Sequence, residues 1–379
     1  MEYKKLGDIA TYINGYAFKP EQRGSEGLPI IRIQDLTGNA YDLGYYNGDY
    51  PKKVELNDGD VLISWSASLG VYLWNRGKAL LNQHIFKVVF DKVEIDKFYF
   101  MYAVEYNLDK MSLKTHGATM KHITKKDFDN VVIPYPDLDY QKEVAYRLTS
   151  LKGIIENYKK QLDLLDELVK ARFVEMFGDP VTNDMLWNTD VLKDICTKIG
   201  SGSTPRGGKE SYIDEGISLI RSMNVHNAYF EYKDLAHITL DQAEKLNNVV
   251  VEHDDLLFNI TGASVARCCV VPSDVLPARV NQHVCILRCR EKINPIFLQG
   301  LLVNENYQGK LLQIAKSGAT REAINKQQLE SLEIMIPPLE LQNQFASFVQ
   351  EIDKSRSRIQ KLLEASQELF DSLMQEYFG

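Results

Sequence analysis

The sequence predicts an α+β protein made of two tandem copies of a mixed globular unit, each followed by a long helix. Three observations lead to this prediction: a phrase that occurs twice, further matching segments in the same order, and a heptad-like spacing of apolar residues after each unit. The chain has 379 residues, about twice the length of a usual domain, so two domains are expected.

The repeated phrase is HGATMKHIT at 116–124 and SGATREAIN at 317–325. The triplet NQH likewise occurs at 82–84 and again at 281–283. Other single residues that stand opposite each other are Asp8 and Asp194, Arg32 and Arg221, Asp60 and Asp255, Gln141 and Gln342, and Gly178 and Gly379. The copies differ only by insertions of loop size, so the whole chain is a tandem duplication.

Apolar residues after each unit recur at steps of four and three, which is typical of a helix with one apolar seam. The first helix is expected from about Gln141 to Phe177 and would be roughly 55 Å long. The seam residues are Val144, Leu148, Leu151, Ile155, Tyr158, Leu162, Leu165, Val169 and Met176, then Phe345, Phe348, Ile352, Ile359, Leu362, Leu369 and Leu373. A lone helix of this kind is unstable in water, so the two should pack against each other, antiparallel about a pseudo-two-fold axis.

The expected boundaries are a globular unit at 1–139, a helix at 140–178, a second unit at 179–340 and a second helix at 341–379. Each unit contains short β-rich runs separated by Gly, Pro and Asn turns, followed by a helical stretch. This pattern predicts mixed α+β units.

Composition excludes some classes of protein. No apolar run approaches the roughly 20 residues of a membrane span, and the first residues do not resemble a signal peptide, so we expect a cytoplasmic protein. The five cysteines are odd in number, which argues against a disulfide framework. The net charge of −8 gives by itself no sign of a nucleic-acid binder, although a local basic surface would be compatible with one.

Two motifs that suggest enzyme chemistry have simpler interpretations. The segment GSTPRGGKE at 202–210 is not a phosphate loop, because Ser203 replaces the first glycine and Glu210 follows the lysine. The segment NPIF at 294–297 resembles an amino-methyltransferase motif, but Asn294 as a helix N-cap and Pro295 in the first turn explain it.

The cysteines do not have the spacing of a usual zinc site. Cys285 and Cys289 stand opposite Phe86 and Phe90 in the first copy. Because phenylalanine cannot replace a metal ligand, small buried core residues are the expected role.

Two duplicated motifs keep two interpretations each. The NQH triplets are either part of a buried hydrogen-bond network or share a functional role. The GAT phrases either bind phosphate oxygens through amides, a threonine and nearby cations, or begin a helix with Thr320 as its N-cap. The two interpretations of the GAT phrases are compatible, since a helix N-terminus is itself an anion site.

The order of these motifs resembles the specificity (S) subunit of type I restriction–modification systems, over the whole chain. The resemblance is carried by SGATREAINKQQLESLEIMIPPLELQNQF and its echo HGATMKHITKKDFDNVVIPYPDLDYQKEV. SGSTPRGG also resembles the Gly-Ser/Thr-Pro loop that opens a target-recognition domain in that family, whereas YINGYAFKP in the first copy departs from it.

This resemblance implies that 1–139 and 179–340 are target-recognition domains, each reading one half of a split double-stranded DNA sequence. Because the loops of the two units differ strongly, we expect an asymmetric target. The helices at 140–178 and 341–379 would fix the gap between the halves. Family members are not catalytic and bind no cofactor themselves. They hold two modification subunits, which use S-adenosylmethionine to methylate adenine, and restriction subunits, which use ATP and Mg²⁺, join that core.

Direct readout uses Arg or Lys for guanine, Asn or Gln for adenine, and Ser or Thr for either. Loop residues of these types are Asn14, Lys19, Arg23, Ser66 and Ser68 in the first unit, and Thr204, Arg206, Lys209, Asn224, Thr261 and Arg267 in the second. The candidates in and beside the repeated phrases are Lys114, His116, Thr119, Lys121, Lys316, Thr320 and Arg321. Among these, Arg206 is the base contact that we single out.

Two other functions are compatible with parts of the pattern. A coiled-coil scaffold with two protein-binding heads would need no DNA reading. An enzyme with an unrecognised active site would need a duplicated polar cluster, and only NQH is kept in both copies.

Overall fold

The computed structural model describes residues 2–38, 44–114, 123–205, 207–317 and 322–379. The chain divides into two compact units: unit 1 is Met1–Lys159 with Lys361–Gly379, and unit 2 is Lys160–Gln360. Each long helix therefore contributes one stretch to each unit.

Unit 1 contains two four-stranded sheets. Their strand orders are β2-β9-β6-β7, which is antiparallel throughout, and β4-β3-β8-β5, in which β3 and β8 are parallel. The strands are β2 (Thr11–Asn14), β3 (Leu28–Ile31), β4 (Gly44–Tyr46), β5 (Glu55–Leu56), β6 (Val61–Ser64), β7 (Gly70–Leu73), β8 (Ala79–Leu81) and β9 (Ile85–Val89).

Unit 2 repeats this topology. Its sheets have the orders β12-β21-β18-β19 and β16-β13-β20-β17, again with one parallel pair, β13 and β20. The strands are β12 (Cys196–Ser201), β13 (Ile217–Ile220), β16 (Ala236–Ile238), β17 (Val250–Val251), β18 (Leu256–Asn259), β19 (Cys268–Val270), β20 (Ala278–Val280) and β21 (Val284–Cys289), and a hairpin of β14 (Val225–His226) and β15 (Tyr229–Phe230) is added. The tandem repeat read from the sequence is thus confirmed by strand order.

Short strand pairs and helices complete each unit. The first segment of each copy pairs antiparallel with the segment before the long helix, as β1 (Tyr3–Lys5) with β10 (Val132–Pro134) and β11 (Thr189–Val191) with β22 (Glu333–Met335). The helices are α1 (Leu6–Ile9), α2 (Ile33–Leu36), α3 (Lys97–Lys114), α4 (Lys125–Asp129), α6 (Leu192–Ile195), α7 (Leu240–Glu244), α8 (Pro295–Val303), α9 (Glu305–Lys316) and α10 (Lys326–Glu330). The predicted α+β class is confirmed.

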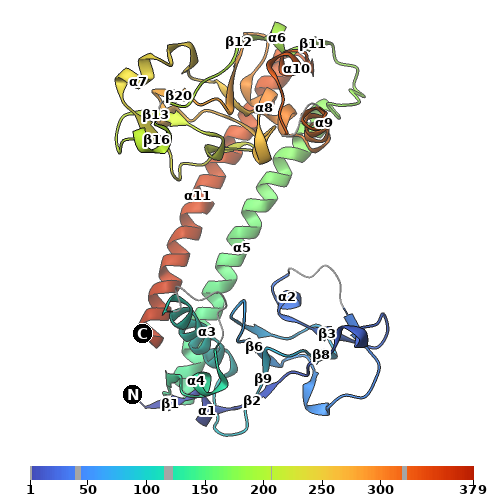
Figure 1. The fold of residues 1–379 in the computed structure, drawn as a ribbon, viewed down its shortest axis with the longest axis vertical. Helices are drawn as coiled ribbons and strands as arrows, with labels where there is room; N and C mark the ends of the chain where they lie inside the picture. Colours follow the sequence, from blue (N-terminus) through green and yellow to red (C-terminus); the bar gives the residue numbers. More distant parts are fainter. Residues whose placement is uncertain (1, 39–43, 115–122, 206, 318–321) are drawn as a thin grey trace. The chain divides into compact units, whose positions relative to one another are not determined.

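The two long helices are α5 (Leu138–Phe177) and α11 (Leu339–Phe378), and in each unit a stretch of one lies beside a stretch of the other (Figure 1). In unit 1, Val144 and Leu148 of α5 share a core with Tyr377 of α11. In unit 2, Phe173 of α5 packs edge-on against Phe345 of α11, with ring centroids 5.5 Å apart. Pairing the end of one helix with the start of the other makes them antiparallel, as predicted.

Two residues of the predicted seam are placed wrongly. Leu362 and Leu369 are about half exposed, while Phe370 and Leu373 pack against the core of unit 1. Leu373 thus lies on the predicted seam, but Phe370 packs inward where Leu369 was expected, and Leu362 and Leu369 lie on an outer face. Steps of three and four allow either register, so the sequence could not separate them.

The duplicated glutamines are buried structural residues. Gln342 is fully buried, and its Oε1 accepts from the backbone N–H of Asn294 (2.8 Å) while its Nε2 donates to the carbonyl of Pro337 (2.8 Å). Gln141 does the same with Asp96 (2.9 Å) and Pro136 (2.8 Å). Each glutamine ties the start of a long helix to the residue that caps an earlier helix, α3 in unit 1 and α8 in unit 2.

We expect Gln342→Leu to lower the free energy of unfolding of unit 2 by about 2–3 kcal/mol, because it leaves a buried N–H and a buried carbonyl without partners. Hydrogen exchange followed by mass spectrometry would show faster exchange at the start of α8. Gln344→Leu, an exposed position on the same helix, is the control and should change little. Equal exchange in the two variants would contradict this role.

Asn294 is the N-cap of α8 and Pro295 its first residue, as predicted. The cysteines are core residues, as predicted: four are buried and Cys289 is half-buried. Burial raises the pKa of the Cys285 thiol to about 12 and that of Cys269 to about 12. Among the described residues, no group of three or more His, Cys, Asp or Glu could hold a metal ion. In the same parts of the chain, every helix is too short or too polar to cross a membrane.

Candidate nucleic-acid interface

The NQH triplet forms the turn that joins the two sheets of each unit, between β8 and β9 and between β20 and β21. The backbone N–H of Asn82 donates to the carbonyl of Ile31, and that of Asn281 donates to Ile220, both at 3.1 Å. In both turns the asparagine is buried, the histidine half-buried and the glutamine exposed. The turn therefore projects one exposed amide, Gln83 or Gln282, from the junction of two sheets.

A glycine lies against this turn in both units. A Cβ on Gly15 would come within 1.9 Å of the Asn82 carbonyl oxygen, and one on Gly202 within 1.8 Å of the Val280 oxygen. Only glycine allows this approach. The close packing holds the end of β2 with Asn14, and the loop after β12 with Thr204, beside the NQH turn.

In unit 2 a chain of polar side chains runs through the turn. The Thr204 hydroxyl donates to Oε1 of Gln282, Nε2 of Gln282 lies 3.1 Å from Nε2 of His283, and Nδ1 of His283 lies 2.6 Å from the Thr261 hydroxyl. An amide nitrogen can only donate, so the neutral ring carries its proton on Nδ1 and donates it to Thr261. The structure thus joins two candidate residues, Thr204 and Thr261, through the NQH motif.

These hydrogen bonds orient the Gln282 side chain but use only part of its hydrogen-bonding capacity. The amide has two oxygen lone pairs and two N–H bonds, and one of each is used by Thr204 and His283. One acceptor and one donor remain on an exposed side chain. That pair is what a glutamine uses to bind adenine.

The ends of the repeated phrases attach to the loop after β6 or β18. The N–H of Ile324 donates to the carbonyl of Ile260 (2.9 Å), and in unit 1 the N–H of Ile123 donates to the carbonyl of Trp65 (3.1 Å). In unit 2 the N–H of Gly262 also donates to the carbonyl of Glu322 (2.9 Å). Each phrase therefore ends beside the loop that carries Thr261 or Ser66.

Arg267 ends the same loop in unit 2. Its guanidinium lies 3.4 Å from Nδ1 of His226. The His226 ring stacks on Tyr229 with centroids 4.6 Å apart, and Tyr229 is about half exposed. A cation and a stacked ring pair thus lie at one end of this loop and Thr261 at the other.

The candidates of unit 1 form a less connected group. Asn14 and Lys19 are exposed, and Ser66 and Ser68 lie in the loop after β6, where both carbonyls accept from the Ser64 hydroxyl. Arg23 is half-buried, and its guanidinium lies 3.5 Å from the carbonyl of Phe18. The Arg23 side chain thereby packs against the loop after β2, which contains Phe18.

One prediction needs correction, because Asn224 is fully buried. Its Oδ1 accepts from the N–H of Arg221 (3.1 Å) and its Nδ2 donates to the carbonyl of Glu231 (2.9 Å). Asp35 closes the equivalent turn in unit 1 by accepting from the N–H of Arg32 (2.8 Å). Asn224 therefore shapes the turn after β13 and cannot reach a ligand from this position.

Lys316 is exposed at the end of α9. The other candidates lie outside the described residues: His116, Thr119, Lys121, Arg206, Thr320 and Arg321, and the side chains of Lys114 and Lys209. Thr320 as an N-cap also stays a prediction. In the described part, α10 is capped instead by Asn325, whose side chain accepts from the N–H of Gln328 (2.9 Å).

Sequence reasoning did not select Gln282 and His283 as site residues. Their signal was present, because NQH is the one polar triplet kept in both copies. What was missing was the fold, which turns the asparagine inward and the glutamine outward.

Comparison with known proteins defines the class. The chain matches the family described as "Type I restriction modification DNA specificity domain" at residues 1–166 and 185–366, and it belongs to this family. It is 24% identical to the EcoBI type I restriction enzyme specificity subunit of Escherichia coli, over 94% of this chain and 80% of that protein. It is 22% identical to the MjaVIII specificity subunit of Methanocaldococcus jannaschii, over 93% and 86%.

The fold agrees with a solved structure. The crystal structure of the type I restriction–modification system S subunit from M. genitalium superposes with a TM-score of 0.63 at 14% identity, covering 100% of this chain and 96% of that one. The chain is thus of the specificity-subunit class, in which catalysis belongs to other subunits.

Proposed function

We propose that this chain binds double-stranded DNA in the cytoplasm and reads a split, asymmetric target, one half with each unit. The observation that carries this proposal is the same exposed amide, Gln83 or Gln282, on the same turn of both units. An oriented glutamine at the junction of two sheets, beside loops rich in threonine, serine and arginine, has the chemistry of base readout.

The proposed asymmetry rests on what surrounds each turn. In unit 2, Gln282 is held by Thr204 and His283. In unit 1, the His84 ring packs edge-on against Trp65, with centroids 5.1 Å apart, and Trp65 takes the place of Ile260. Different neighbours present different donors, acceptors and apolar surfaces, so the halves of the target should differ in sequence.

The proposed partners are two modification subunits, which would bind S-adenosylmethionine and methylate adenine, and restriction subunits, which would use ATP and Mg²⁺. Outer faces of the long helices support a docking role. Leu164 and Leu168 lie one turn apart on α5 and are about half exposed, and Leu362 and Leu369 lie two turns apart on α11 with similar exposure. In this proposal α5 and α11 also fix the gap between the half-sites, since spacing along B-DNA decides which groove faces each reader.

A binding selection from randomised duplexes, with the chain bound to its modification subunits, tests this function. We expect a split motif with a fixed, unread gap. Exchanging residues 1–139 for those of another family member should change one half of the motif and leave the other half and the gap unchanged. Binding without any motif at low salt would contradict the proposal and favour the scaffold without DNA reading.

A further inference from the structure

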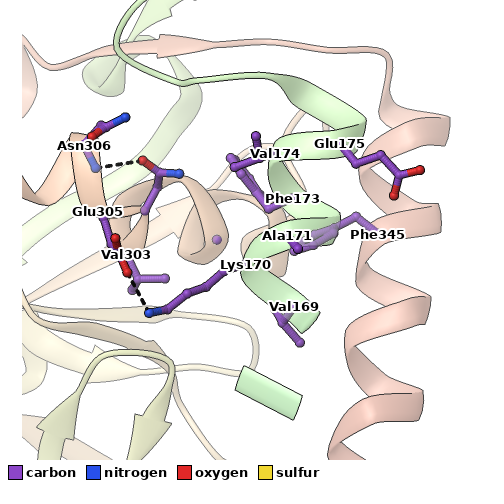
Figure 2. A pocket seen from close by; sticks show the side chains of 12 residues that line it. Val169, Lys170, Ala171, Phe173, Val174, Glu175, Val303, Glu305, Asn306 and Phe345 are labelled. Atoms are coloured by element: carbon purple, nitrogen blue, oxygen red, sulfur yellow. Dashed lines mark hydrogen bonds and ion pairs between the residues drawn. The ribbon is translucent and has the colours of Figure 1, made fainter. Parts of the chain in front are cut away.

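An apolar pocket of about 620 Å³ lies within unit 2, between the end of α5, the junction of α8 and α9, and the start of α11. Its residues include Val169, Phe173 and Val174 of α5, Val303 of α8 and Phe345 of α11. Figure 2 shows Phe173 and Val174 together on α5, with Val303 across from them. The volume is in the range that binds ligands or large side chains.

The internal repeat shows what fills this place in unit 1. Helices α3 and α8 are equivalent, because the side chains of Asp96 and Asn294 each accept from a backbone N–H in the first turn, and the N–H groups of both residues donate to the buried glutamine of a long helix. Counting from these caps, Tyr102 and Tyr106 of α3 stand opposite Gly300 and Asn304. Both unit 2 residues line the pocket.

The two tyrosines cover the end of a long helix in unit 1. Tyr102 lies 6.1 Å from Phe370 and Tyr106 lies 6.2 Å from Phe378, measured between ring centroids. Phe378 precedes the final glycine as Phe177 precedes Gly178, so the end of α5 is the equivalent segment in unit 2. At the end of α5, no aromatic ring stands in the places of Tyr102 and Tyr106, because their counterparts are Gly300 and Asn304.

Residue 300 of unit 2 has no room for an aromatic side chain. A Cβ on Gly300 would come within 2.9 Å of the Phe173 ring and 3.0 Å of the Phe345 ring. These two buried phenylalanines line the pocket beside Gly300 and leave no room for a side chain there. A ring in the pocket therefore cannot come from position 300, and a partner protein can supply one.

The edge of the pocket is polar. Lys170 of α5 forms an ion pair with Glu305 of α9 at 2.9 Å, and both side chains are largely exposed (Figure 2). Opposite charges at the edge and an apolar floor are the arrangement of a protein–protein contact with a buried anchor. A helix that carries aromatic residues one turn apart on one face, with charged residues beside them, matches both parts.

We propose that this pocket binds two aromatic side chains, one helical turn apart, on a helix of a partner protein. This inference rests on the proposed function, in which the partner is one of the two modification subunits. In unit 1 the equivalent place is taken by Tyr102 and Tyr106. The two modification subunits therefore bind the two units through different contacts, and the anchored one dissociates more slowly.

Val174→Glu tests the inference, since Val174 lines the pocket and is 46% exposed. Titration of the variant with purified modification subunit, followed by native mass spectrometry, should show one of two binding events weakened about 30-fold, as expected for a buried anchor. Val174→Trp, which fills the pocket without adding charge, should have the same effect. Val181→Glu is the matched control, with 43% exposure outside the pocket, and should bind two subunits as the wild type does.

Two unchanged binding events in both Val174 variants would overturn the inference and leave the proposed function intact. Wild-type protein that binds no modification subunit would instead contradict the proposed function. Self-association of the chain that Val174→Glu abolishes would assign the pocket to a second copy and also overturn the inference.

Discussion

Asp255→Asn should lower the free energy of unfolding of unit 2 by about 3 kcal/mol, near the cost of breaking a buried ion pair. Asp255 is fully buried, and its carboxylate receives two hydrogen bonds from Arg288, both at 2.8 Å, and one from the N–H of Glu252 at 2.7 Å. The change leaves the guanidinium of Arg288, whose side chain is 22% exposed, without its buried carboxylate and paired with the more exposed Glu252.

Hydrogen exchange with mass spectrometry, resolved over β18 and β21, measures this effect. Asp254→Asn is the control: Asp254 is exposed and has a φ of 63°, which asparagine tolerates. In unit 1, Asp60 is held by Lys87 at 2.8 Å and is 21% exposed, so Asp60→Asn should cost less. A larger effect at Asp254 or at Asp60 would contradict this account.

Gln282→Ala should remove sequence preference at one position in one half of the DNA target. A bidentate contact between glutamine and adenine discriminates by about 1–3 kcal/mol, or roughly 5- to 150-fold. Gln83→Ala, the same change at the equivalent turn of unit 1, should affect the other half only. The measurement is competition binding against every single-base variant of the target, with modification subunits present.

The two variants control for each other, because both glutamines are exposed and each fold should be unaffected. Uniform weakening over all sequences would show that Gln282 contacts the backbone of DNA and does not read a base. Changes in the same half for both variants would contradict the assignment of one half to each unit.

The duplication, the α+β class and the long helices were predictable because each has a local signal. Repeated phrases survive in the chain as written, and steps of three and four mark a helix wherever it packs. The N-cap at Asn294 was predictable for the same reason, since it depends only on its own residue and the next few. The buried cysteines followed from comparing one copy with the other.

Other features depend on contacts between distant segments. Leu362 was placed on the wrong face, because apolar spacing permits two registers and the packing partner decides between them. Asn224 has the chemistry of a base-reading residue, but the turn after β13 buries it among backbone groups.

By itself the sequence determined the repeat, the classes of element and the residue types available for DNA. Only the tertiary structure decided which of those residues meet. Thr204, Gln282 and Thr261 are far apart in the chain and are joined through His283, because a glycine lets one loop pack against the turn between two sheets. The pocket at Gly300 likewise exists only in three dimensions, since it is the surface that two tyrosines cover in the other copy.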